Sequence, residues 1–426
     1  MKPQEMINAI KSGVMDEKLK AVYVTDAFVE EQKPRYIMLL EEFEKLFGGD
    51  RDVIITSAPG RTEVCGNHTD HNNGKVLAAS INLDAVGVVA KSDEPTVRVK
   101  SLGHAMNVVD ITNLAPDEAE YGNSTEMVRG VISKINDWGY EIGGFDALTT
   151  SDVMGGSGLS SSAAFEVLIG TTVSYLFNDG KISAVEIAKA AQYAENAFFG
   201  KPCGLLDQMA SSVGTFVTID FESTEEPVIK KVAFDFSKSG HSLCIIDTGG
   251  SHSDLTDDYA AVRQEMESVA KAMGKNVLRE ISFEDFKAAV PSLMGKVNDR
   301  AILRAFHFYN ENIRVDKAVS ALESGDFDTF KQVICSSGLS SYMYNQNVFS
   351  PSNPTEQKLS VALCISQEML EGKGAYRVHG GGFAGTIQAF VPNEILAEYK
   401  AAMESVFGEG KCYVLIIRPV GGTKVM

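Results

Sequence analysis

The sequence lacks several features that would place it in a large class of proteins. It has no apolar run near the ~20 residues that span a bilayer, and residues 1–5 are polar rather than the start of a secretion signal. Its six cysteines are widely spaced and form no Cys-x-x-Cys pair, so neither a zinc site nor a thioredoxin-like dithiol is indicated. We therefore expect reduced thiols and a cytoplasmic protein.

Positive charge is also scarce. The 39 Lys and Arg residues stand against 57 Asp and Glu, a formal net charge of −18, which argues against broad binding to nucleic acid or anionic membranes. A local anion site is not excluded, because backbone N–H groups hold phosphates even inside acidic proteins. The composition, 44% hydrophobic and 23% charged, is that of a soluble globular protein, and 426 residues predict two domains.

A glycine- and serine-rich stretch stands out at residues 155–164, Gly-Gly-Ser-Gly-Leu-Ser-Ser-Ser-Ala-Ala. Its glycines let a ligand approach the backbone, and the helical run that follows directs free N–H groups and its positive dipole end toward the loop. Both features favour a polyphosphate. No Lys follows, which excludes the P-loop of nucleotide hydrolases. A plain linker before a helix is the alternative.

Hydrophobic periodicity predicts a mixed α and β protein. Residues 3–48 are expected to be helical up to a Gly-Gly pair, and residues 76–113 to form an antiparallel sheet of short strands. Further helices are expected at 125–138, 160–178, 183–199, 254–273, 283–291, 298–323, 326–336 and 355–370, and further strands at 52–57, 214–221, 228–234, 242–248, 375–380, 384–391 and 411–418. A polar, irregular stretch near 225–240 indicates a domain boundary.

Two more glycine-punctuated segments accompany the stretch at 155–164. Residues 58–74 read APGRTEVCGNHTDHNNG, and residues 378–385 read VHGGGFAG. Taken in chain order, residues 58–74, 155–164 and 378–385 resemble the three motifs of the GHMP small-molecule kinases. The first resembles the galactokinase signature, Gly-Arg-Val-Asn-Leu-Ile-Gly-Glu-His-Thr-Asp-Tyr-Asn-x-Gly. The resemblance extends from about residue 25 to the last residue.

This resemblance implies an α+β, two-domain GHMP kinase architecture. We expect an N-terminal helical arm over residues 1–50, a ribosomal protein S5 domain 2-like N-terminal domain over 51–235 and a ferredoxin-like C-terminal domain over 236–426. The implied activity is ATP- and Mg²⁺-dependent phosphorylation of a sugar at C1, as in galactokinases, which convert D-galactose to α-D-galactose 1-phosphate. The expected partners are ATP and a monosaccharide, with neither nucleic acid nor membrane, and the expected state is a monomer.

The resemblance also assigns the phosphate and metal sites. ATP binding falls on Gly156, Ser157, Gly158, Leu159, Ser160, Ser161 and Ser162. Ser162 matches the family's Mg²⁺-coordinating serine and Glu195 its metal carboxylate, which suits the preference of Mg²⁺ for hard oxygen ligands. Without the resemblance, Ser162 is interpreted as a helix cap and Glu195 as a solvated helix residue.

The catalytic pair follows from two matches. Asp207, in Cys-Gly-Leu-Leu-Asp-Gln, matches the base that accepts the proton of the anomeric hydroxyl. Arg61 matches the arginine beside that Asp, where a guanidinium keeps the carboxylate ionised and stabilises charge on the transferring phosphoryl group. The alternative for Arg61 is a surface ion pair.

The sugar pocket is assigned to Asn67, His68, Thr69, Asp70, Gly204 and Tyr259. The chain departs from the signature at Glu63, Asn67 and His71, where the family has Asn, Glu and Tyr. That family Glu accepts a hydrogen bond from the sugar's 6-hydroxyl. Two interpretations are open: the Asn67 amide itself binds a hydroxyl or a C6 carboxylate, or the carboxylate has moved to Glu63.

Two further residues or segments have no place in this scheme. His379 stands where the family has Thr or Ser, and its role is open. Residues 337–341, Ser-Gly-Leu-Ser-Ser, repeat part of the phosphate stretch but lack the glycine pair before it, so we interpret them as structural.

Galactokinase is the leading functional hypothesis. The first alternative is a GHMP kinase for another sugar, such as galacturonate or N-acetylgalactosamine. The second is a catalytically silent sugar sensor, against which the intact phosphate stretch and Asp207 argue.

Overall fold

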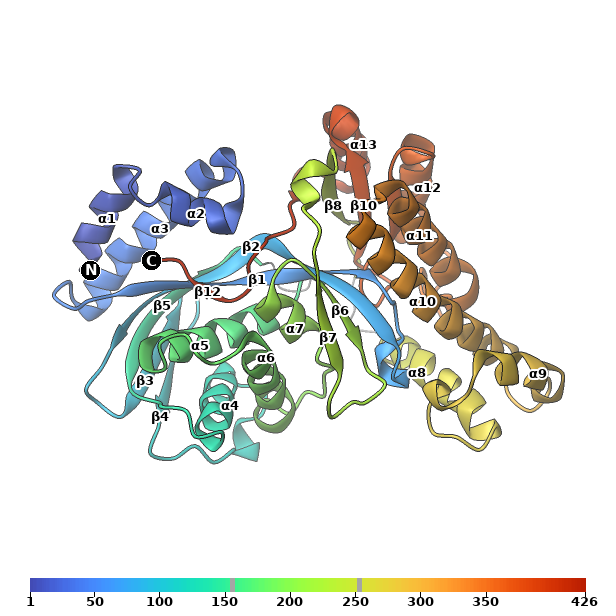
Figure 1. Ribbon diagram of the computed structural model, residues 1–426, viewed down its shortest axis with the longest axis horizontal. Coiled ribbons are helices and arrows are strands. Elements are labelled where there is room, and N and C mark those ends of the chain that lie inside the picture. Colours follow the sequence, from blue (N-terminus) through green and yellow to red (C-terminus); the bar gives the residue numbers. More distant parts are fainter. Residues whose placement is uncertain (154–157, 251–254) are drawn as a thin grey trace.

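The computed structural model describes residues 1–153, 158–250 and 255–426 (Figure 1). Its α-helices are α1 (Pro3–Lys11), α2 (Asp16–Tyr23), α3 (Asp26–Phe47), α4 (Ser124–Asp137), α5 (Ser161–Phe177), α6 (Ala184–Tyr193), α7 (Leu206–Val213), α8 (Thr256–Ala272), α9 (Phe283–Leu293), α10 (Asp299–Ser324), α11 (Phe327–Ser340), α12 (Lys358–Leu370) and α13 (Leu396–Phe407). Its strands are β1 (Ile54–Cys65), β2 (Lys75–Lys91), β3 (Thr96–Ser101), β4 (Met106–Asp110), β5 (Phe145–Ser151), β6 (Phe216–Asp220), β7 (Val228–Val232), β8 (His241–Asp247), β9 (Ala375–Val378), β10 (Thr386–Pro392), β11 (Cys412–Leu415) and β12 (Thr423–Lys424).

The larger sheet is organised around the long strand β2. Its strand order is β12-β1-β2-β5-β3-β4, and β6 and β7 extend it where β6 pairs with β2. Side chains alternate across β2 with period two, so that Val86 and Val88 face one side while Ala85 and Val89 face the other. The sheet is therefore apolar on both faces and needs a helical layer on each.

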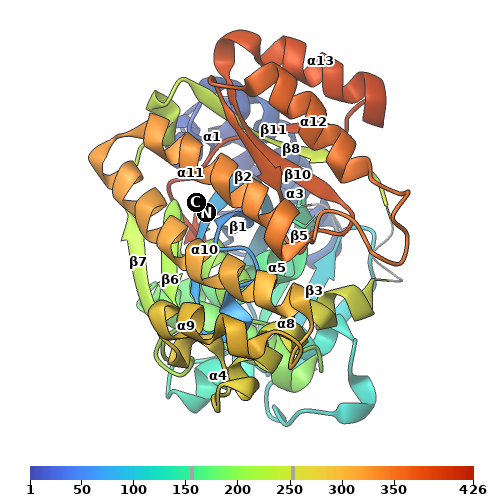
Figure 2. The ribbon, with the colours of Figure 1, turned by 90° about the vertical axis from the view of Figure 1, so that its right-hand side faces the viewer.

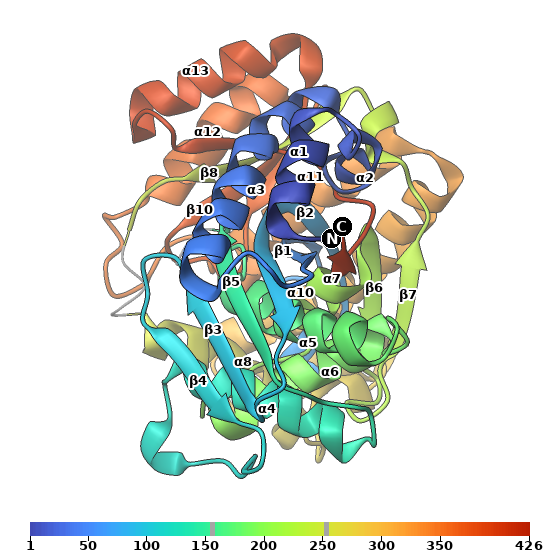
Figure 3. The same cartoon turned by 90° about the vertical axis from the view of Figure 1, so that its left-hand side faces the viewer.

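Those two layers come from different parts of the chain. Helices α4, α5 and α6 pack on one face, and the N-terminal arm α1–α3 packs on the other (Figures 1 and 3). Both chain ends lie against β1: Val53 N–H donates to Met1 O at 2.9 Å, and Ile55 N–H to Met426 O at 3.0 Å. The last residues thus return to the first sheet, where β12 pairs with β1.

The smaller sheet is antiparallel, with the order β11-β8-β10-β9. Helices α12 and α13 cover one face of this sheet, where they pack against apolar side chains of β8 and β10. Helices α10 and α11 lie side by side and contact both sheets (Figure 2). They thereby bring the glycine segment after β9 next to the end of β1, which carries the first sequence motif.

The mixed α and β composition and the expected helices are confirmed, with ends that differ by a few residues. The expected sheet over 76–113 is wrong in two respects. Strand β2 continues through residues 82–84 without a turn, and β3 pairs in parallel with β5 rather than with β2. Helices α7 and α13 and strands β5 and β12 were not predicted. The domain limits at 50/51 and 235/236 stay a prediction. Among the described helices, none is long and apolar enough to cross a membrane.

All six cysteines are free, as expected. The serine-rich repeat at 337–341 ends helix α11 and begins a π-helical turn, Ser341–Asn345. Its hydroxyls bond to protein groups: Ser340 to His307 at 2.9 Å and Ser337 to Glu311. The segment is therefore a packed helix end and not a second phosphate loop.

Candidate active site

The first and second sequence motifs meet at Arg61. Its Nε donates to Asp207 Oδ1 at 2.7 Å, and its Nη1 donates to the carbonyl of Gly158. Ser160 Oγ donates to the other carboxylate oxygen of Asp207. The Arg61 side chain is 10% exposed, whereas Asp207 is 34% exposed and so remains accessible to a ligand.

The phosphate motif can be followed from residue 158 onward, because Gly156 and Ser157 lie outside the described residues. Gly158 and Ser160 adopt positive φ of 73° and 60°, and α5 begins at Ser161. A serine in the left-handed region is uncommon and is typical of loops held for function. The turn places residues 158–162 at the N-terminus of a 17-residue helix, the arrangement that favours bound phosphate.

His379, which had no assigned role, joins all three motifs. Its Nε2 accepts from the Glu63 N–H at 3.4 Å and lies 3.1 Å from Thr62 Oγ1, while Nδ1 lies 3.0 Å from Thr386 Oγ1. A Cβ at Gly158 would lie 3.6 Å from the imidazole. Burial, together with Arg61 and Arg377, holds the pKa of His379 well below its usual value, so the ring is neutral. His379 is therefore a buried, neutral side chain that lies against residues of all three motifs.

The loop between β1 and β2 carries the predicted sugar-binding residues. A Cβ on Gly204 would stand 3.1 Å from Asp70 Oδ2, so the absence of a side chain there leaves room around the Asp70 carboxylate. His68 Nε2 donates to Gly381 O at 2.8 Å, which leaves Nδ1 as the acceptor of the ring. Burial and neighbouring His71 lower the pKa of His68 to about 3, so it is neutral.

Asn67 is 1% exposed, and every hydrogen-bonding position of its amide is used. Its Nδ2 donates to Glu63 Oε1 at 2.8 Å and to Gly380 O at 2.7 Å. Its Oδ1 accepts from Asn347 Nδ2 at 2.8 Å and from Ser341 Oγ at 3.4 Å. A sugar hydroxyl would have to displace one of these bonds to reach the amide.

The hydroxyl groups of Thr69 and Tyr259 also form hydrogen bonds within the protein. Thr69 is fully buried, and its hydroxyl lies 2.7 Å from Lys75 O and 2.9 Å from Gly66 O within the loop. Tyr259 Oη donates to Gly382 O at 2.9 Å, and its ring would meet a Cβ on Gly381 at 2.5 Å. Both residues shape the backbone around the predicted sugar pocket, and Tyr259 does so from helix α8.

A buried cluster of carboxylates lies beside Asp207. Gln208, the next residue on α7, donates Nε2 to Glu195 Oε2 at 2.8 Å and to Glu166 Oε2 at 3.2 Å. Glu195 lies in a π-helical turn, Ala194–Phe198, a feature frequent at functional sites, and Lys201 reaches its other oxygen at 3.0 Å. Glu166 follows Ser162 by one turn of α5 and was not predicted, although the spacing of four residues would have indicated it.

This cluster fits a divalent cation. Glu166 Oε1 is buried and has no hydrogen-bond partner among the described residues. Burial and the charge of Glu195 raise the pKa of Glu166 well above its usual value. Two carboxylates that share one amide repel each other, and a hard cation with oxygen ligands would relieve that repulsion. The described residues contain no cluster of three or more His, Cys, Asp or Glu that would hold a metal unaided.

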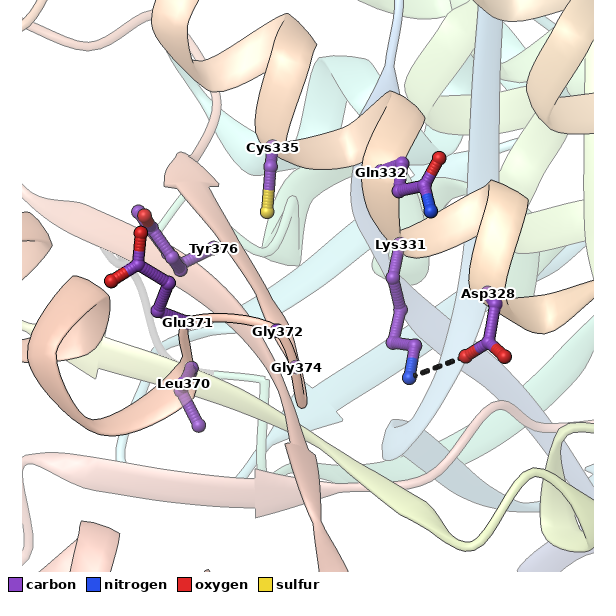
Figure 4. A pocket seen from close by; sticks show the side chains of 9 residues that line it. All are labelled: Asp328, Lys331, Gln332, Cys335, Leu370, Glu371, Gly372, Gly374 and Tyr376. Atoms are coloured by element: carbon purple, nitrogen blue, oxygen red, sulfur yellow. Dashed lines mark ion pairs between the residues drawn. The ribbon is translucent and has the colours of Figure 1, made fainter.

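Among the cavities of the described residues, none of which was predicted, two concern the site and its surroundings. One, of about 540 Å³, adjoins the phosphate motif and is lined by Val153 before it, Ser161 and Phe165 after it, and His104 and Asn107 from the β3–β4 hairpin. The other, of about 460 Å³, lies in the C-terminal half between α11 and β9 (Figure 4). Its lining includes the Lys331–Asp328 ion pair at 2.9 Å and none of the predicted site residues.

The comparisons with known proteins agree with these motifs. Residues 41–91 match the galactokinase galactose-binding signature, and residues 126–215 match the N-terminal domain of GHMP kinases. The galactokinase of Actinobacillus pleuropneumoniae is 34% identical over 346 residues, which cover 79% of this chain and 85% of that protein. The chain belongs to the galactokinase family. Another family member, from Glaesserella parasuis serovar 5, is 34% identical over 83% of this chain and 88% of its own length.

Solved structures extend the agreement to the fold. Lactococcus lactis galactokinase, solved in complex with galactose, is 25% identical and superposes with a TM-score of 0.75 over 90% of this chain and 98% of its own. Methanococcus jannaschii mevalonate kinase shares the fold, with a TM-score of 0.62 at 15% identity over 87% of this chain and 99% of its own. The GHMP kinase architecture, the family and the assignment as a sugar kinase are therefore confirmed, whereas the roles of individual site residues stay predictions.

Proposed function

We propose that this galactokinase family member transfers the γ-phosphoryl group of ATP to the anomeric hydroxyl of D-galactose. The observation that carries the proposal is Asp207, which is held by Arg61 and Ser160 at the phosphate motif and still partly exposed. The Asp207 carboxylate thereby lies next to the predicted phosphate motif, with its exposed part open to a sugar hydroxyl. A base must have that placement to act in phosphoryl transfer.

In the proposed reaction Asp207 accepts the proton of the C1 hydroxyl as that oxygen attacks the γ-phosphorus. The bond from the γ-phosphorus to the β,γ-bridging oxygen breaks, and ADP leaves with the bond electrons. Arg61 orients the Asp207 carboxylate through their ion pair and offers positive charge to the phosphoryl oxygens during the transfer. The N–H groups at the start of α5 hold the phosphates in line with the acceptor.

The sugar is proposed to lie against Asp70, His68 and Gly204, with Asn67, Thr69 and Tyr259 holding the surrounding backbone. Asp70 accepts hydrogen bonds from ring hydroxyls, and Gly204 allows them to approach. Glu63 supplies the carboxylate that the family has at position 67. Its side chain is 13% exposed and accepts from Asn67 Nδ2 at 2.8 Å, which supports a position beside the signature loop.

Magnesium is the proposed metal, with Ser162, Glu195 and Glu166 as the protein groups that would hold it. When bound, the ion would neutralise charge on the β- and γ-phosphates. Gln208 orients the two carboxylates through its shared amide. The nucleoside is proposed to occupy the 540 Å³ cavity, because Val153 and Ser161 in its wall bracket the phosphate motif. We propose a cytoplasmic monomer.

The test is a coupled ADP-release assay with galactose, galacturonate, N-acetylgalactosamine, 6-deoxygalactose and glucose. Galactose is expected to give the highest kcat/KM, and the product is expected to carry phosphate at C1. Preference for galacturonate or N-acetylgalactosamine would instead establish the other-sugar alternative. Sugar binding without turnover of any member of the panel would establish the sensor.

A further inference from the structure

An arginine of the N-terminal arm lies on the nucleotide side of the site. Arg35, on α3, is only 11% exposed and lies between the arm and the larger sheet. Its Nη1 pairs with Asp84 Oδ1 at 2.7 Å and with Asp152 Oδ2 at 2.9 Å. Its Nη2 donates to the carbonyls of Asp84 at 2.8 Å and Thr150 at 3.2 Å. One guanidinium thus binds the carboxylate and carbonyl of Asp84 in β2, the carbonyl of Thr150 in β5 and the carboxylate of Asp152 just after β5.

The two carboxylates differ in how much they depend on Arg35. Asp84 is fully buried and is also held by Tyr23, Ser57 and Arg418. Asp152 is 37% exposed, and the contacts described for its carboxylate come from Arg35 and from Gln32, one turn earlier on α3. Loss of Arg35 would therefore leave Asp84 with three side-chain partners, but the Asp152 carboxylate with the 3.5 Å contact to Gln32.

Asp152 has a position that matters for the nucleotide. It follows β5 directly, and its N–H donates to Asp84 O at 3.0 Å. The next residue, Val153, lines the cavity beside the phosphate motif. The N-terminal arm therefore contacts the chain at Asp152, the residue directly before Val153 in the cavity wall.

We propose that Arg35 is a positioning residue that makes ATP binding depend on the N-terminal arm. By fixing Asp152 it fixes the neighbouring Val153 and with it one wall of the cavity, while the sugar loop at residues 66–74 lies beyond its contacts. The proposal rests on the function proposed above for that motif and cavity.

The experiment compares Arg35→Met, Arg35→Lys and Asp152→Asn with the wild type. The matched control is Lys33→Met, since Lys33 lies on the same helix but pairs with Asp16 and Glu30 inside the arm. We expect Arg35→Met and Asp152→Asn to raise KM for ATP about tenfold, the effect of losing a charged hydrogen bond. KM for the sugar and kcat are expected to change less than about twofold, and Arg35→Lys to recover part of the loss.

The double variant Arg35→Met/Asp152→Asn is expected to be no worse than either single variant, because the two residues act through one contact. Titration of a fluorescent ATP analogue provides the same comparison without turnover, so it holds even if the sugar were misassigned. Equal rises in both KM values, or a lowered melting temperature with unchanged ATP affinity, would overturn the proposal. If Arg35→Met does not fold, Asp152→Asn decides it, since that side chain is part exposed.

Discussion

Asn67 donates its side-chain amide to the carboxylate of Glu63 at 2.8 Å. They are two of the positions at which the chain departs from the galactokinase signature, with Glu and Asn in each other's places. In this chain the exchanged residues form a carboxylate–amide pair. It supports the interpretation that the carboxylate has moved to Glu63.

This pair leads to a prediction about substrate choice. Asn67→Glu would place a second carboxylate against Glu63 in a buried site, and would break the bonds to Gly380 and Asn347, so we expect a lower melting temperature and at least a tenfold higher KM for galactose, about the effect of one lost buried hydrogen bond. The double exchange Glu63→Asn/Asn67→Glu is expected to recover most of both losses. The measurements are thermal unfolding and kinetics with galactose and 6-deoxygalactose.

The outcome of that exchange distinguishes the two interpretations of C6 recognition. If Glu63 binds the 6-hydroxyl of the sugar, Glu63→Gln should lower the ratio of kcat/KM for galactose to that for 6-deoxygalactose. Asn67→Ala should then mainly lower the melting temperature. A single variant Asn67→Glu that gains selectivity and keeps its stability would show that Asn67 itself faces the sugar.

Asp207 is expected to be needed for chemistry and not for nucleotide binding. Asp207→Asn keeps the shape of the side chain but removes the base, so kcat should fall by about 10²–10⁴-fold. The affinity for an ATP analogue, measured by titration, should stay within about threefold, because the contacts of Asp207 are to Arg61 and Ser160 rather than to the helix N–H groups. Near-normal turnover in a folded Asn variant would remove Asp207 from the role of base.

The carboxylate cluster predicts how magnesium dependence responds to substitution and pH. Glu195→Gln and Glu166→Gln should each raise the Mg²⁺ concentration for half activity by about tenfold or more. The raised pKa of Glu166 means that protons compete with the ion, so the Mg²⁺ requirement of the wild type should increase as pH falls. In Glu166→Gln that pH dependence should be weaker. Sugar binding measured without nucleotide serves as the control, and the cluster has no role in metal binding if Mg²⁺ dependence is unaltered in both variants.

Glu311 predicts the acid sensitivity of the fold. It is fully buried and accepts from the Gly66 N–H at 3.1 Å. Although burial alone would raise its pKa, His307, Arg377 and Arg314 bring the value down to about 2. A carboxyl with a depressed folded pKa stabilises the protein above its unfolded pKa, and that contribution disappears as pH falls toward the folded value.

We therefore expect Glu311→Gln to lower the free energy of unfolding by about 3 kcal/mol near neutral pH, the equivalent of the pKa shift. The difference from the wild type should shrink between about pH 4.5 and pH 2, where the wild-type carboxyl becomes protonated. Denaturant unfolding across this range measures it. A difference between the two proteins that does not change with pH would contradict the assignment of the stabilisation to the Glu311 charge.

The sequence by itself determined the family, the order of the motifs and most helices, and it predicted the site residues Arg61, Asp70 and Asp207. These features are local. A motif is a run of neighbouring residues, and a helix or strand is indicated by apolar residues that recur with a period of 3.6 or 2 residues. The same locality explains the misreading of residues 76–113. The pattern indicates strands but does not contain the pairing of β3 with β5.

Only the tertiary structure decided which polar side chains contact one another. It joined Glu63 to Asn67, placed His379 behind Gly158, added Glu166 to Glu195 through Gln208, and linked Arg35 to Asp152. Except for the first, these pairs are far apart along the chain. Their contacts depend on strand register and on which buried polar groups must satisfy one another, because an unpaired buried group is costly. That requirement acts in three dimensions and leaves no periodic trace in the sequence.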